Sequence, residues 1–358
     1  MSTSNPRVGS PRPRSPGGLL KGVADQSAVA SGVVVGAVLV VAMFLGSRYL
    51  ANFDVALLGY AIGTVFLAGG ATYRAVTWAK SPAARRYLAR GWKALLRPGP
   101  SGSVLDAPKT VASTLLLQRF ISKRSNGRWL AHQSLFWGVI TATLITFPLT
   151  FGWVHFRAVE GSASGYWVYV MGKRTVQFDA LSILGFLVFH GLNFSAILVI
   201  CGAVFYLHKR WSEKAANLTR FGRDLMPLIA LVAISVTGLA LTASSTWTEG
   251  FLYGPLAFIH MCTVVLTLIW IPFGKFFHTI QRPAMIGVQL YKQSSLESEG
   301  SLNCRTCGEP LEGAVFVADL QKTMSELDLG YSGWIETCPR CKRIERGAQY
   351  REQVKAGF

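Results

Sequence analysis

The chain has 358 residues, of which 51% are hydrophobic and only 15% are charged, and its mean hydropathy is +0.35. This composition excludes an ordinary soluble domain and is typical of a multi-pass membrane protein with soluble segments attached. A net charge of +18 could suit a nucleic-acid partner. The basic residues lie mainly beside apolar stretches, however, where they mark membrane topology. We therefore expect no nucleic acid as a partner.

The chain begins with a polar tail and two apolar stretches. Residues 1–27 are rich in Pro, Gly, Ser and Arg, which predicts a disordered cytoplasmic tail. The stretches at 28–50 and 55–77 are long enough to span a bilayer, and the short segment between them predicts a helical hairpin. Both contain several glycines, which would allow close helix packing. Neither contains a histidine, so we interpret the hairpin as scaffold.

A strongly basic segment follows the hairpin. Residues 74–97 contain seven Lys or Arg and no acidic residue, and such segments stay in the cytoplasm. The sequence AARRYLARGWKALL within it predicts an interfacial helix. This helix could bind anionic membrane lipid or an acidic partner, and the simpler interpretation is a retention signal.

Four more apolar stretches follow, at 129–154, 178–207, 225–243 and 257–278. The loop at 208–224 is strongly basic, whereas the loops at 155–178 and 244–254 contain few or no basic residues. This alternation predicts six spans with both termini in the cytoplasm, in the plasma (inner) membrane of the cell. We therefore predict an all-α polytopic membrane protein, in which residues 28–283 form a six-helix transmembrane bundle.

The last apolar stretch contains His260 near its start and His278 at its end. If residues 257–278 form one helix, the spacing of 18 residues equals about five turns and places both imidazoles on one face, about 27 Å apart. That separation approaches the hydrocarbon thickness of about 30 Å. Imidazole is a common axial ligand of haem iron. The spacing therefore suggests a haem b ligand near each side of the membrane; the alternative is two ordinary interfacial histidines.

Each haem would need a second ligand from a facing helix. By depth along the predicted spans, His132 belongs with His278 on the cytoplasmic side, and His190 belongs with His260 in the outer half. We predict these two pairs as the haem ligands. The secondary candidates are His208, on the inner side, and His155, at the outer boundary.

These histidines carry a family resemblance. From HQSLFWG at 132–138 to the last stretch, which ends in PFGKFFH, the chain resembles the membrane cytochrome b (gamma) subunit of respiratory nitrate reductase. It also resembles related membrane subunits of heterodisulfide reductase-like complexes. The resemblance covers about residues 55–283 and implies b haems held between two helices, with His260, His278 and His132 as ligands. It also implies electron transfer between the quinone pool and a cytoplasmic iron–sulfur partner.

The chain departs from the family at one ligand position. The nitrate reductase subunit has a second histidine ten residues after the position of His132, and this chain has Ala142 there. The outer haem thus lacks the usual partner of His260. Either His190 or His155 substitutes for it, or only the inner haem is bound.

Residues 284–358 are polar and contain two CxxC pairs, Cys304 with Cys307 and Cys338 with Cys341. Four thiolates suit tetrahedral zinc or a single iron. The reducing cytoplasm disfavours disulfides between them. We therefore predict a zinc-ribbon or rubredoxin-like metal module, in which zinc would support partner docking and iron would relay electrons.

Together these features predict a non-catalytic electron-transfer subunit. It would bind one or two b haems and link quinone, as substrate, to a cytoplasmic iron–sulfur oxidoreductase subunit. The alternative is a haem-free membrane anchor whose metal module docks a soluble complex. A small-solute transporter is disfavoured, because the spans have few polar groups and no inverted repeat.

Overall fold

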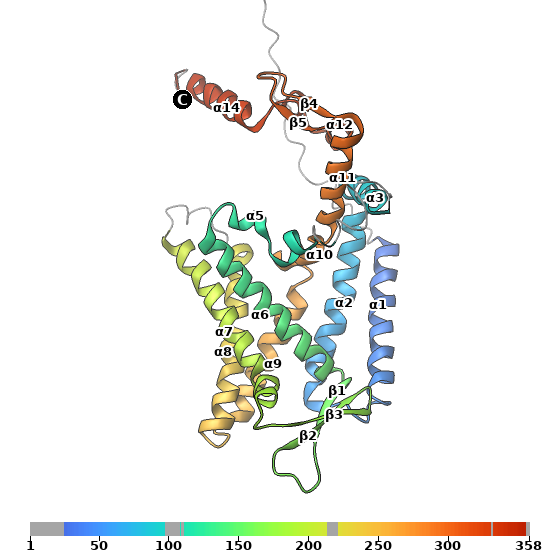
Figure 1. Cartoon of the computed structure of the whole chain (residues 1–358), viewed down its shortest axis with the longest axis vertical. Helices are drawn as coiled ribbons and strands as arrows, with labels where there is room; N and C mark the ends of the chain where they lie inside the picture. Colours follow the sequence, from blue (N-terminus) through green and yellow to red (C-terminus); the bar gives the residue numbers. More distant parts are fainter. Residues whose placement is uncertain (1–24, 97–107, 109–110, 213–220, 331, 356–358) are drawn as a thin grey trace, which may run out of the picture.

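The computed structural model describes residues 25–96, 108, 111–212, 221–330 and 332–355. In this part of the chain, six helices are long and apolar enough to cross a membrane, and they form one bundle (Figure 1). A small sheet lies at one end of the bundle, and a module with the four cysteines stands beyond the other end. The predicted six-span helical fold with a four-cysteine module is thus confirmed. Residues 1–24 of the predicted tail lie outside the part of the chain that the structure describes.

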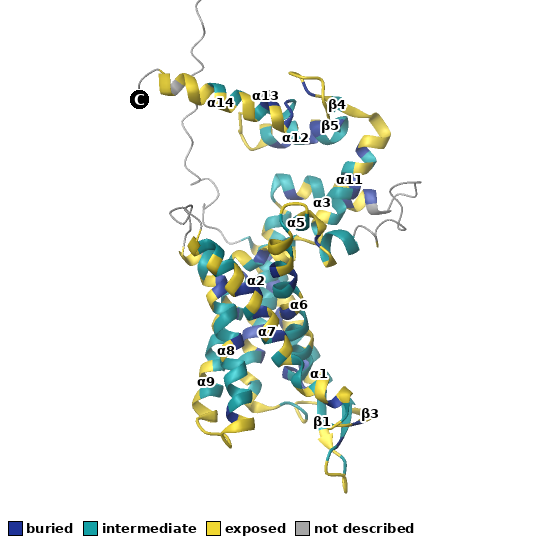
Figure 2. Cartoon of the chain, turned by 60° about the vertical axis from the view of Figure 1, so that its left-hand side comes forward, coloured by how far each residue is buried: buried dark blue, intermediate teal, exposed yellow. Residues whose placement is uncertain are grey.

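The outer surface of the bundle is apolar. Large side chains such as Val33, Leu144 and Leu266 are 65%, 70% and 67% exposed. Exposed and half-buried residues cover the spans in Figure 2, with few fully buried ones. Apolar side chains exposed over whole helices need hydrocarbon rather than water around them. The arrangement is that of a multi-pass membrane protein.

The six spanning helices are α1 (Gln26–Gly46), α2 (Leu58–Ala79), α6 (Asn126–Thr150), α7 (Ile183–Ser212), α8 (Met226–Trp247) and α9 (Tyr253–Trp270). Along the bundle α2 packs on α9, α9 on α8, α8 on α7 and α7 on α6. Because α2 also touches α6, these five helices form a ring. Helix α1 packs on α2 outside this ring.

The α1–α2 hairpin packs through glycines, as the sequence predicts. A Cβ added to Gly32 would lie 2.7 Å from the carbonyl oxygen of Gly69. Any larger residue would push the helices apart. At the open end of the hairpin Asp25 accepts hydrogen bonds from the first N–H groups of α1 and pairs with Lys80 at 2.6 Å. A 3₁₀ turn (Val55–Leu57) leads into α2.

The outer loop predicted at 155–178 is instead a three-stranded antiparallel sheet, with strand order β1-β2-β3. The strands are β1 (Val154–Ala158), β2 (Gly165–Val170) and β3 (Lys173–Asp179). Met171 and Gly172 have positive φ angles of 49° and 71° and form the tight turn between β2 and β3. The missed signal was the aromatic and β-branched run YWVYV, followed by Met171 and Gly172.

This sheet shortens two of the predicted spans. Helix α6 ends at Thr150 rather than near residue 154, and α7 begins at Ile183 rather than at residue 178. His155 consequently lies on β1 and not on a helix. Apolar residues at the edges of the strands adjoin the apolar helices in the sequence. Hydropathy alone therefore could not locate the end of α6 or the start of α7.

The prediction of one helix over residues 257–278 is wrong. Helix α9 ends at Trp270, because Pro272 lacks an N–H group and its ring blocks the helical position of the carbonyl four residues earlier. His260 and His278 therefore do not share one face of one helix. The five-turn argument fails, and any pairing of these histidines with others depends on the tertiary structure.

The end of α9 is held by a side chain from α2. The guanidinium of Arg74 donates hydrogen bonds to the carbonyls of Pro272 and Gly274 and stacks 4.4 Å from the Phe277 ring. Both carbonyls lie in the turn that follows the end of α9 at Trp270. A 3₁₀ turn (Lys275–Phe277) then leads into the short helix α10 (His278–Gln281).

The basic segment forms the predicted surface helix, α3 (Pro82–Leu96), and its Trp92 is 64% exposed. It packs along α11 (Ala284–Glu299), beyond the end of the bundle (Figure 1). The two backbones touch, since a Cβ added to Gly91 would lie 2.7 Å from the carbonyl carbon of Gly287. Glycine permits this close approach.

Shorter elements complete the described chain. Before α6 and α8 lie two π turns and a short helix, which are Ala112–Leu116, α5 (Arg119–Ser122) and Phe221–Leu225. The module that follows α11 consists of β4 (Ser301–Asn303), β5 (Pro310–Gly313), α12 (Ala314–Glu326), α13 (Ser332–Ile335) and α14 (Pro339–Lys355). Strands β4 and β5 pair antiparallel.

Asp319 of α12 joins this module to α3 and α11. Its carboxylate accepts hydrogen bonds from the Tyr291 hydroxyl at 2.7 Å and from Arg90 Nε at 2.9 Å. Arg86 of α3 pairs with Glu326 at 2.5 Å. Burial, together with the neighbouring carboxylate, raises the pKa of Tyr291. The module is therefore fixed to the membrane part by a polar joint.

Replacing Asp319 with alanine should loosen this joint. Loss of the carboxylate leaves the Tyr291 hydroxyl without its partner, at a cost of about 1.5–3 kcal/mol. Hydrogen–deuterium exchange of α12 should then accelerate by about 10- to 150-fold. Glu312→Gln is the control, because it removes an ion pair with Lys292 whose side chains are 35% and 43% exposed. Equal exchange rates of α12 in the wild type and in Asp319→Ala would show that Asp319 does not stabilise the contact between the module and α11.

Candidate metal centre and histidine sites

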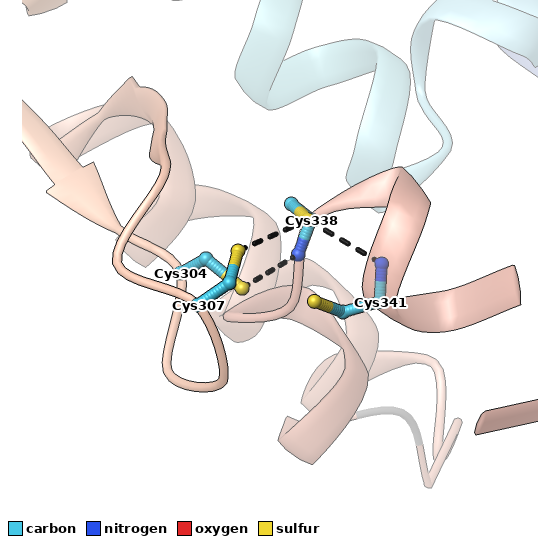
Figure 3. A group of neighbouring side chains, drawn as sticks. All are labelled: Cys304, Cys307, Cys338 and Cys341. Carbon is cyan, nitrogen blue, oxygen red and sulfur yellow. Dashed lines mark hydrogen bonds between the residues drawn. The ribbon is translucent and has the colours of Figure 1, made fainter. Parts of the chain in front are cut away.

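The four predicted cysteines meet in one cluster. Cys304 and Cys307 lie in the loop between β4 and β5, and Cys338 and Cys341 lie at the start of α14 (Figure 3). All four sulfur atoms lie within 4.8 Å of one another. The Sγ atoms of Cys307 and Cys338 are 3.7 Å apart. Zinc–sulfur bonds of about 2.3 Å in a tetrahedron give edges of about 3.8 Å.

Backbone N–H groups point at the sulfur atoms. The N–H of Cys338 donates to Cys304 Sγ at 3.2 Å, and the N–H of Cys341 donates to Cys338 Sγ at 3.4 Å. The first of these bonds lowers the pKa of Cys304 to about 6. Burial raises the pKa of Cys341 to about 12. One thiol thus ionises readily, whereas the full set of thiolates needs a cation to offset its charge.

The loop conformation suits a metal knuckle. Gly308 has a φ of 73°, and its N–H donates to the carbonyl of Cys304 at 2.8 Å, which closes the first turn. The N–H of Arg305 donates to the carbonyl of Glu336 at 2.9 Å and ties the first knuckle to the second. Three of the cysteines are buried and Cys307 is exposed. The cluster can hold one metal ion with a single edge open to solvent.

The structure brings His132 and His278 toward each other at the end of the bundle nearest the module. His278 and Arg282 lie within electrostatic range of the His132 imidazole. His132 Nδ1 is buried and has no hydrogen-bond partner among the described residues. His278 Nδ1 lies 2.7 Å from the carbonyl of Lys275, which can only accept. His278 therefore carries its proton on Nδ1, and its Nε2 is available as a ligand atom.

His260 is oriented by the neighbouring helix α8. Its Nδ1 lies 2.8 Å from the hydroxyl of Thr237, and that hydroxyl donates to the carbonyl of Ala233 at 2.7 Å. The hydroxyl thus accepts from Nδ1, which leaves Nε2 unprotonated. Thr267, two turns further along α9, is buried, so this face of the helix points into the protein. His260 has the hydrogen bonding of a ligand histidine.

His190, the predicted partner of His260, lies on α7 and faces away from the buried side of that helix. His190 stacks on Phe186 at 4.4 Å and its Nδ1 lies 3.0 Å from the Phe186 carbonyl. Val199, nine residues later and about 180° around α7, is buried. His190 therefore points away from the buried face. No hydrogen bond or ring contact joins it to His260 among the described residues, and their pairing stays a prediction.

The two secondary candidates have local roles in the described structure. His155 stacks on Tyr169 of the sheet at 5.0 Å, and burial lowers its pKa. His208 is exposed near the end of α7, with its Nε2 3.5 Å from the hydroxyl of Ser212. Neither is brought close to another histidine by a described contact.

Sequence reasoning missed the groups that orient these histidines. The Thr237 hydroxyl lies on a different helix from His260, and nothing in the sequence links the two positions. The Lys275 carbonyl could not be found either, because it becomes an acceptor only once α9 ends early. No protein family, curated protein or solved structure matches the chain.

Proposed function

We propose that the chain is a membrane haem b electron-transfer subunit that links the quinone pool to a cytoplasmic iron–sulfur oxidoreductase. The observation that carries this proposal is the approach of His132 and His278 at the end of the bundle nearest the four-cysteine module. Both side chains belong to the segment that resembles the nitrate reductase gamma subunit. We therefore place an inner haem b between them.

The residues fit such a group. A haem held by two imidazoles supplies one-electron redox chemistry. The Lys275 carbonyl holds the His278 ring by its Nδ1 proton and directs Nε2 away from that hydrogen bond. On the other side, His132 has a buried nitrogen without a partner among the described residues. An unpaired buried polar atom is costly, and a cofactor at this position would offset that cost.

The four-cysteine module supports a docking or relay role on the same side. It holds one zinc or iron ion in this proposal, and the soluble partner approaches beside it. The basic surface of α3 sits between the module and the bundle, where it would meet anionic lipid. With the positive segments inside, both termini face the cytoplasm and the protein lies in the plasma (inner) membrane.

The test is the reduced-minus-oxidised absorption spectrum of the detergent-purified chain, with haem counted per protein. We expect b-type bands and at least one haem per chain. Two haems would add a second site at His260, with His190 or His155 as its partner. No haem from cells that synthesise it would reject the proposal.

The second candidate is a haem-free membrane anchor. The polar joint at Asp319, Arg86 and Arg90 favours it, because it fixes the metal module firmly to the membrane part. Ala142 at the family's ligand position also favours it. An anchor predicts a colourless bundle with metal bound only at the cysteines, so the same spectrum distinguishes the two functions.

A further inference from the structure

Helix α14 (Pro339–Lys355) has one side against the four-cysteine module and one side in solvent. It begins at the second pair of cysteines and runs away from the rest of the module toward the end of the described chain (Figure 1, Figure 2). Its Cys341 is buried in the cluster, and the guanidinium of Arg346 lies 5.9 Å from the ring of Trp334 in α13. These contacts define the side of α14 that faces the module.

Basic and apolar side chains share the other side of α14. At about 100° per residue, they fall within an arc of about 140° around the helix. The exposed basic members are Arg340, Arg343, Arg351 and Lys355. The apolar members are Ile344, Tyr350 and Val354, which are 58%, 68% and 57% exposed. Both acidic residues of α14, Glu345 and Glu352, fall nearly opposite this arc. We call this side of α14 the basic face.

The composition of the basic face is that of an interface. A helix of 17 residues is only marginally stable in water by itself. Large side chains that stay in solvent, such as Tyr350, contribute no burial free energy to it. Exposed aromatic and arginine side chains are enriched where proteins bind one another. This face is therefore built to be covered by another macromolecule.

The charge of the basic face selects an acidic protein surface. Four positive charges with no acidic residue among them attract carboxylates and repel basic surfaces. The membrane is a poorer match, because α14 lies farther from the spanning helices than α3 does (Figure 1). Nucleic acid is also a poorer match, since the apolar side chains between the charges suit a groove on a protein better than a row of phosphates.

We propose that the basic face of α14 docks the soluble partner of this membrane protein by lying in an apolar groove with an acidic rim. Ile344, Tyr350 and Val354 fill the groove, and the arginines pair with carboxylates at its rim. The assignment rests on the proposed function, which calls for a soluble partner on this side of the membrane. Because α14 follows Cys338 directly, a partner bound along it lies beside the metal cluster.

The test is carbodiimide cross-linking of the full chain in its native membranes, which joins an amine to a carboxylate where the two are in contact. We expect an adduct between Lys355 and an Asp or Glu of a second protein, mapped by mass spectrometry. Lys355→Arg should lose this adduct, because arginine keeps the charge but has no reactive amine. Tyr350→Ala and Arg351→Gln should each reduce its yield roughly fivefold or more, since aromatic and arginine side chains dominate interface energies.

Gln349→Glu is the matched control. Like Arg351→Gln, it lowers the charge of α14 by one at an exposed position, but Gln349 lies outside the basic face. Its adduct yield should match the wild type, and every variant should keep its metal, since none of the four cysteines is altered. Equal yields from Tyr350→Ala, Arg351→Gln and Gln349→Glu would overturn the docking face. An adduct at Lys342 alone, on the side that faces the module, would also overturn it.

Two further measurements separate other partners and the proposed function. Protection of α14 from hydrogen–deuterium exchange by phosphatidylglycerol nanodiscs, relative to phosphatidylcholine nanodiscs, would assign the face to lipid and overturn the proposal. Protection by polyuridylate would assign it to nucleic acid, with the same consequence. With haem counted in the chain from the same cells, an adduct without haem would reject the electron-transfer function and keep the docking face. Haem without an adduct would reject only the docking face.

Discussion

Replacing Cys304 with serine should remove the metal ion from the four-cysteine site and open the module. Cys304 is 4% exposed, and its sulfur atom accepts the N–H of Cys338 from the second knuckle. Structural zinc sites of this kind contribute about 10–16 kcal/mol of apparent binding free energy, which is also folding free energy. Among the described residues, Leu311 is the partly buried apolar side chain that packs against the buried cysteines, so the ion would supply much of the cohesion at this point.

The measurement is metal content by mass spectrometry, together with limited proteolysis between β4 and α14. We expect about one zinc or iron per wild-type chain and almost none in Cys304→Ser, with rapid cleavage of the module. Cys262→Ser is the control, because this cysteine lies in the spanning helix α9 and outside the cluster. Unchanged metal in Cys304→Ser would show that the ion is not held there.

Replacing His278 or His132 with alanine should each remove one b haem per chain. Each substitution deletes one of the two proposed axial ligands, so the site with two imidazoles can no longer form. The two variants should therefore lose the same spectral component. The measurement is the reduced-minus-oxidised spectrum with haem counted per purified chain.

His208→Ala serves as the control for these variants. His208 also lies near the module end of the bundle, but it is exposed and bonded locally to Ser212. We expect its haem content to match the wild type. A His278→Ala chain that keeps its full haem content would remove this histidine from the site. Comparison of His260→Ala with His190→Ala would then show whether a second haem uses either of them.

The sequence alone determined the membrane class, the number of spans and the four-cysteine site. These features are local. A run of about 20 apolar residues specifies a spanning helix wherever it lies, and two CxxC turns carry their ligands with them. The basic segment before residue 97 likewise predicted the surface helix α3, because its basic residues and Trp92 lie close together within one short stretch of the chain.

Tertiary structure decided the remaining features, because each depends on residues that are far apart in the chain. Arg74 holds the end of α9 from another helix, and Thr237 orients His260 across a helix interface. Hydropathy counts apolar residues and does not detect strand pairing, so it predicted a loop where the sheet lies and placed the ends of two spans a few residues inside that sheet. The approach of His132 to His278 depends on the early end of α9 and on the 3₁₀ turn that follows it. Sequence spacing describes one helix, whereas a site between helices is set by how their side chains pack.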